Sequence, residues 1–158
     1  MSVANSPELM DKLLTGLRLA VTEMMTAMAM SEVVFAGQES VDHFSLTSEV
    51  VGLVRLDGQM TGMVGVSCSQ ALLREIVSRI VGLTPDELMM EDLLDGAAEL
   101  GNMVCGGMKT KAQIGGVNLS PPVAIVGQEY TAQWKTNRPT TLFTFQMEEG
   151  ILKVYASL

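Results

Sequence analysis

The chain has 158 residues, of which 47% are hydrophobic and 18% charged, and this composition predicts one compact domain over residues 1–158 rather than a disordered segment. Its formal net charge of −8 excludes the usual nucleic-acid binders, which need clustered lysine and arginine, and it disfavours anionic membranes. Because the sequence has neither an apolar run of about 18 residues nor the start of a signal peptide, we expect a soluble cytoplasmic protein.

Residues 7–30 are predicted to form a first long helix. Their apolar side chains recur at helical spacing, Ser6 can cap the helix, and Pro7 suits its first position. The methionine-rich end of this helix, residues 22–30, is expected to fill the core, with an adaptable partner surface as the alternative.

After a polar connection, a hairpin and a second helix follow. Residues 50–56 and 60–68 alternate with period two around Asp57-Gly58, which favours an antiparallel strand pair. The next helix is predicted over 70–81, between a serine cap and a terminal glycine.

The third helix is predicted to open at Pro85 and the acidic residues after it, and to end at Gly115-Gly116. A strand over 118–126 is interrupted by Pro121-Pro122, and residues 127–140 form a polar excursion. This excursion is either a dimer or partner contact, through Tyr130 and Trp134, or a packed surface loop. The chain closes with a second hairpin, formed by residues 141–147 and 151–156.

Residue types that commonly carry catalysis or bind metals are scarce. Cys68 and Cys105 lie outside any C-x-x-C pair and His43 is the sole histidine, so no zinc ligand set can be assembled. We expect both cysteines to be reduced core residues, and a nucleophile assisted by His43 is available only in principle. The sequence also lacks the glycine-rich dinucleotide and P-loop motifs.

Glu99 and Asn102 are the candidate functional pair. At about 100° per residue they are neighbours on the polar stripe of the third helix, whose other sides are apolar. A Glu-x-x-Asn pattern alone is common in helices, so its context has to support a function. The helix also holds four glycines, at 96, 101, 106 and 107, which weaken it but permit close approach of another backbone. We expect sheet packing on the inner side and a partner on the outer side.

The two halves of the chain show a weak internal duplication. Each begins with a helix that contains a glutamate and ends in a hairpin. Aligning Glu23 with Glu99 places Thr26 opposite Asn102, so the first copy keeps the carboxylate and lacks the amide.

Several of these residues match a known pattern. The third helix carries Glu-x-x-Asn-Met-x-x-Gly-x-x-Lys as Glu99, Asn102, Met103, Gly106 and Lys109, and the match extends to residues 62–82 and 118–127. In this the chain resembles the CheC, CheX and FliY phosphatases, which act on phosphorylated response regulators of bacterial chemotaxis. The single complete copy of the pair resembles the CheX type more than the two-site CheC type.

The resemblance implies an α+β, CheC-like fold of two layers, an antiparallel sheet packed against long helices, and a homodimer. It implies that Asn102 orients a water to attack the aspartyl-phosphate of a CheY-like response regulator, while Glu99 pairs with the lysine of that receiver. Asp95, Met103, Gly106 and Lys109 would contact the receiver, which would supply a divalent metal such as Mg²⁺, so the chain needs no cofactor of its own. The alternative is a catalytically silent, dimeric interaction module of a signalling or flagellar switch complex.

Overall fold

The computed structural model describes residues 6–42 and 44–158. Its elements, in chain order, are α1 (Pro7–Met28), β1 (Val33–Val41), β2 (Phe44–Gly58), β3 (Gly62–Cys68), α2 (Gln70–Val81), the short 3₁₀ helix η2 (Pro85–Glu87), α3 (Met90–Ala112), β4 (Val117–Leu119), β5 (Val123–Trp134), β6 (Thr140–Met147) and β7 (Gly150–Ser157).

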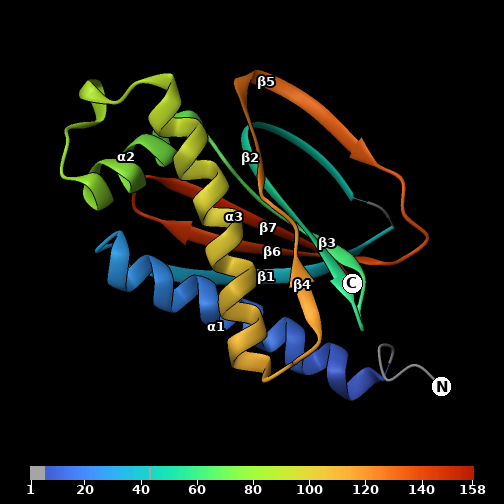
Figure 1. Ribbon diagram of the computed structural model, residues 1–158. Helices are drawn as coiled ribbons and strands as arrows, with labels where there is room; N and C mark the ends of the chain where they lie inside the picture. The colour runs from blue at the N-terminus through green and yellow to red at the C-terminus, as the bar shows by residue number, and fades with distance from the viewer. Residues whose placement is uncertain (1–5, 43) are drawn as a thin grey trace.

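The seven strands form one antiparallel sheet, and α1 and α3 cross in front of it (Figure 1). The strand order is β1-β6-β7-β3-β2-β4, and β5 pairs with β2 as well. The main core lies between the helices and the sheet, and a smaller cluster around Leu46, Val51 and Tyr155 lies apart from it. This arrangement confirms the predicted two-layer α+β fold. Among the described residues, no helix combines the length and apolarity needed to cross a bilayer.

The two halves of the chain contribute equivalent strands to the sheet. In the order β1-β6-β7-β3-β2-β5, each strand of one half has its counterpart at the mirrored place in the other half. The first half contains β1 and the β2–β3 hairpin, and the second contains β5 and the β6–β7 hairpin. β1 pairs with β6 and β5 pairs with β2, so the first strand of each half borders the hairpin of the other half. The two hairpins meet where β3 pairs with β7. The predicted pseudo-two-fold duplication is therefore confirmed, with its axis between β3 and β7.

The helix caps follow the sequence. The hydroxyl of Ser6 accepts the N–H of Leu9, and the hydroxyl of Ser69 accepts that of Leu72, each at 3.1 Å. Gly82 ends α2 in the left-handed conformation, at φ 78°. α1 and α2 accordingly begin where the sequence predicts.

Two edge strands depart from the prediction. The sequence suggests a connection where β1 lies, and a polar excursion over 127–140 where β5 continues to Trp134. Both strands pair on one side only, and along the first half of β1 half-buried residues alternate with exposed ones. Residues 37–40 of β1 and 127–134 of β5 are mostly polar, as exposed edge strands often are, so these segments resemble loops in sequence.

Two boundaries also differ. Asp57 and Gly58 belong to β2, where they pair with β4, so the hairpin turn lies after them. α3 begins at Met90 rather than Pro85, because Pro85–Glu87 form the separate helix η2. The Glu87 carboxylate accepts the N–H and the hydroxyl of Thr84, and these hydrogen bonds lower the pKa of the carboxyl group.

Candidate functional site

α3 lies on the sheet at a contact between two backbones. A Cβ atom on Gly52 of β2 would lie 2.1 Å from the carbonyl oxygen of Ala97, and one on Gly101 would lie 3.3 Å from the carbonyl group of Gly52. Gly52 and Gly101 therefore allow α3 to approach β2 closely. This contact fixes the inner side of α3, as predicted, and so determines which side faces outward.

Glu99 and Asn102 lie on the outer side of α3. Glu99 is exposed and Asn102 is half-buried, while Leu100, Gly101 and Val104 beside them are buried. Within residues 6–42 and 44–158, neither of these two side chains makes a hydrogen bond or an ion pair. The carboxylate and the carboxamide thus project side by side from a helix that is anchored by its opposite face.

Three neighbouring residues of α3 also lie on its outer side. Asp95 is exposed, Met103 and Gly106 are half-buried, and a Cβ atom added to Gly106 would meet no atom within 4 Å. The packing of the described chain therefore does not require a glycine at 106, in contrast to Gly96 and Gly107, where an added Cβ would lie within 3 Å of Val77 or Ala20.

Lys109 is engaged within the chain. Its ammonium group donates to the carbonyl oxygen of Val117, at the start of β4. This hydrogen bond joins the end of α3 to the sheet, a structural contact that the sequence does not predict. Its role in docking remains a prediction.

A groove of about 420 Å³, which we call the α2–α3 groove, opens beside Glu99. Asp92, Asp95, Glu99 and Met103 of α3 line it, together with Val77, Ile80 and Val81 of α2 and Met28 of α1. This groove is not among the features predicted from the sequence. A signal was present, because the apolar residues of α2 at 72, 73, 76, 77, 80 and 81 form a stripe wider than the core covers, which leaves Ile80 and Val81 exposed.

The corresponding residues of α1 have other partners. The ammonium group of Lys111 lies 2.6 Å from the Glu23 carboxylate, and the Thr26 hydroxyl donates to the Thr22 carbonyl at 2.8 Å. In the first copy, on α1, Thr26 therefore stands where α3 has Asn102, and the Glu23 carboxylate is already paired with Lys111.

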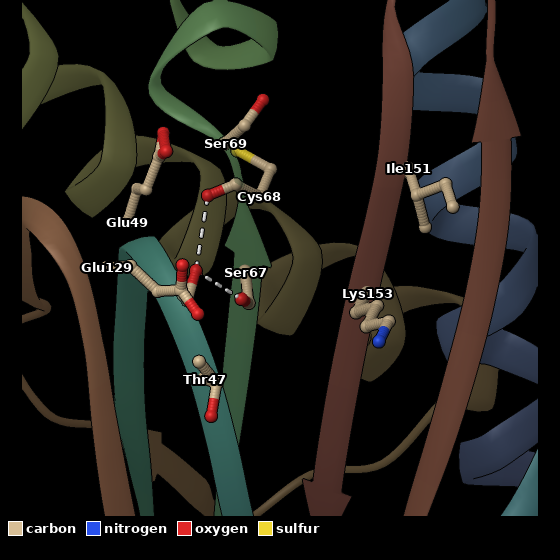
Figure 2. Close-up of a pocket in the computed structure, with 9 residues that line it drawn as sticks. Thr47, Glu49, Ser67, Cys68, Ser69, Glu129, Ile151 and Lys153 are labelled. Carbon is tan, nitrogen blue, oxygen red and sulfur yellow. Dashed lines mark hydrogen bonds between the residues drawn. The ribbon is translucent and has the colours of Figure 1, made fainter.

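Figure 2 shows a second concavity, of about 310 Å³, where β2, β3, β5 and β7 come together. The Ser67 hydroxyl donates to Ser48 at 2.7 Å, and the Ser48 hydroxyl lies 3.1 Å from the Cys68 carbonyl oxygen. One oxygen of Glu49 accepts the N–H of Gln70 at 2.8 Å. Burial, with a smaller contribution from Glu49, raises the pKa of the Cys68 thiol to about 12, so the thiol is protonated near neutral pH. These contacts hold β2, β3 and the start of α2 together.

In the part of the chain that the structure describes, no three His, Cys, Asp or Glu side chains gather as metal ligands would. His43 lies outside the described residues.

Comparison with known proteins gives a family and a fold. The family described as "Chemotaxis phosphatase CheX" matches residues 50–146, more than half of the chain. A CheX structure from Desulfovibrio desulfuricans is 19% identical, with a TM-score of 0.82 over 92% of this chain and 98% of that one. CheX from Vibrio vulnificus is 22% identical, with a TM-score of 0.77 over 95% and 98%. The CheX-CheY-BeF3-Mg complex from Borrelia burgdorferi is 16% identical, with a TM-score of 0.72 over 92% and 96%. No curated protein sequence matches the chain.

Proposed function

Because this chain belongs to the CheX family of chemotaxis phosphatases, we propose that it hydrolyses the aspartyl-phosphate of a CheY-like response regulator. The observation that carries the proposal is the pair of Glu99 and Asn102, which project outward from one helix and are not engaged by other described residues. The complex of a CheX with CheY from Borrelia burgdorferi supports the choice of partner.

The proposed chemistry requires little of this chain beyond positioning. A phospho-aspartate is a reactive acyl phosphate, so a catalyst need only place a water in line with the phosphorus. The Asn102 amide both donates and accepts hydrogen bonds, and it orients that water. Glu99 pairs with the receiver's lysine and fixes the register of docking. The receiver supplies the divalent ion, Mg²⁺, that stabilises the developing charge.

Four further residues of α3 form the rest of the contact with the receiver. Gly106 leaves space for the receiver backbone, and Asp95, Met103 and Lys109 border it. Asp92, Asp95 and Glu99 make this side of α3 acidic, and receiver sites hold acidic residues too, so affinity rests on the receiver's metal, on its basic side chains and on apolar contacts. The homodimer implied by the family remains a prediction, which light scattering of the purified protein would check.

The test is loss of phosphate from a phosphorylated receiver. Asn102→Ala should slow the accelerated reaction by about 100-fold, because the water is no longer held in line. The fold should persist, since the change removes no core volume. Asn137→Ala, at an exposed asparagine of the β5–β6 connection, is the matched control. Equal acceleration by Asn102→Ala and wild type would refute the assignment. Binding that depends on phosphorylation but leads to no turnover would favour the silent interaction module.

Glu99→Ala should act mainly through docking. We expect it to raise the receiver concentration needed for half-maximal rate, because the ion pair with the receiver's lysine is lost. Charge reversal at that lysine should reproduce the loss with wild-type protein.

A further inference from the structure

We infer that the α2–α3 groove receives an apolar side chain, flanked by lysine or arginine, from the same receiver whose phosphoryl group reaches Asn102. This inference rests on the proposed function and extends it from a catalytic pair to a docking surface.

Glu99 belongs both to the proposed catalytic pair and to the lining of the α2–α3 groove. At about 100° per residue, Asn102 projects to one side of Glu99, and Gly96 and Met103 project to the other, toward the groove. A specific interface covers about 800 Å² on each partner, far more than two side chains provide. A receiver seated over Asn102 and Glu99 therefore has to cover a neighbouring surface as well.

The groove is the apolar surface that adjoins the pair. The exposed side chains Val123 and Ile125 of β5 lie on the other face of the sheet, because Ala124 and Val126, which alternate with them, pack against the core under α3. By contrast, Ile80 is 42% exposed and lies across the groove from Glu99.

Three large apolar side chains of the groove are open to solvent. Met28, Ile80 and Val81, which are 37%, 42% and 52% exposed, all belong to its lining. Exposed apolar side chains that share one groove mark an interaction surface rather than ordinary scatter.

The lining of the groove indicates the chemistry of its occupant. Asp92, Asp95 and Glu99 form an acidic wall, and its described lining contains no lysine or arginine. An apolar group with a basic flank complements both features. Met28 and Met103 belong to the lining, and the unbranched, flexible thioether of methionine adapts to the shape of the side chain that enters.

The experiment measures binding to receiver domains from the same cell, activated with beryllofluoride and Mg²⁺, and in parallel the rate of phosphate loss. Ile80→Gln should weaken binding by about tenfold and raise the KM, with the rate at saturation retained. Leu19→Gln, at an exposed helical position outside the groove, is the matched control. Asp95→Asn should weaken binding to the receiver at low salt, and its difference in affinity from wild type should shrink as salt rises. Asp11→Asn, the control, should bind the receiver like wild type at both salt concentrations.

Four outcomes separate the claims. If wild type is active and Ile80→Gln binds the receiver with unchanged affinity, the groove inference alone is wrong. If Asp95→Asn binds the receiver more tightly than wild type, the side chain in the groove has no basic flank. A change of oligomeric state in Ile80→Gln, without a change in receiver affinity, would make the groove a contact between copies of this chain. Wild type that neither binds nor dephosphorylates any receiver would overturn the proposed function and the inference together.

Discussion

Gly106 and Gly107 are neighbours in α3, yet they have different surroundings. A Cβ atom on Gly106 would meet nothing within 4 Å, whereas one on Gly107 would lie 2.7 Å from the Cβ of Ala20 in α1. Gly107 is therefore needed for the crossing of the two helices. Gly106 has no such role in the described chain, in agreement with its proposed place under a partner.

This difference predicts opposite effects of the same substitution. Gly106→Ala should stabilise the protein by about 0.5–1 kcal/mol, since alanine favours the helix and nothing obstructs its methyl group. Gly107→Ala should lower stability, because α1 and α3 must move apart. Urea unfolding of the two variants compares them directly, and effects of the same sign and size would contradict the packing described above.

Cys68 and Cys105 give the stability a dependence on pH. Both are buried, and burial raises the pKa of each thiol to about 12, against about 8.5 in an unfolded chain. Above pH 8.5 the unfolded chain loses protons that the folded chain keeps, so stability falls as pH rises from there toward 12. The slope approaches about 1.4 kcal/mol per pH unit for each thiol.

The measurement is urea unfolding at pH 8 and pH 10 for wild type and for the double variant Cys68→Ala with Cys105→Ala. Wild type should lose more stability over this interval than the double variant. An equal loss in both proteins would show that other groups cause the pH dependence.

α2 is positioned by contacts at its far end. The Arg79 guanidinium donates to the Glu149 carboxylate in the β6–β7 turn and, at 3.4 Å, to the carbonyl of Ala29 beyond α1. Both charged side chains are half-buried. One arginine thus joins three parts of the chain at the helix that forms a wall of the α2–α3 groove.

Glu149→Ala should therefore lower stability by about 1–2 kcal/mol, since it removes the nearer of the two carboxylates that pair with a partly buried guanidinium and leaves only Glu75, at 3.8 Å. Glu8→Ala is the control: Glu8 and Lys12 form an ion pair at 3.4 Å that is open to solvent, so its loss should change stability by less than about 0.5 kcal/mol. Denaturant midpoints of both variants decide the matter, and similar small shifts would refute the structural role of Arg79.

The methionine-rich end of α1 divides between the two alternatives that the sequence leaves open. Met25 is 1% exposed and fills the core, as expected. Met28 is 37% exposed and lines the α2–α3 groove, where a partner surface was the alternative. Both uses suit an unbranched side chain that fits irregular surfaces.

The duplication of the whole molecule raises the question of a second active pair. Thr26→Asn in an Asn102→Ala background supplies an amide on α1 in place of the one removed from α3. We expect no recovery of receiver dephosphorylation, because the Glu23 carboxylate is held by Lys111. Assays of the double variant and of the same protein with Lys111→Gln test this. Recovery in the double variant itself would contradict the explanation.

Periodicity along short stretches was enough to predict much of this fold. The outward stripe of α3 with Glu99 and Asn102, the caps of α1 and α2 and the β6–β7 hairpin all follow from residues close together in the chain, and the duplication is the same local pattern met twice. Their geometry is set by the repeat of the helix or strand itself.

The other features depend on segments that are distant in sequence. β1 and the end of β5 are strands because β6 and β2 supply their hydrogen bonds, and the α2–α3 groove exists because Met28, Ile80 and Glu99 converge from three helices. The hydrogen bond from Lys109 to Val117 and the contrast between Gly106 and Gly107 likewise arise from the path of the chain. Such contacts depend on which surfaces the chain brings together, and no local pattern of residues encodes that.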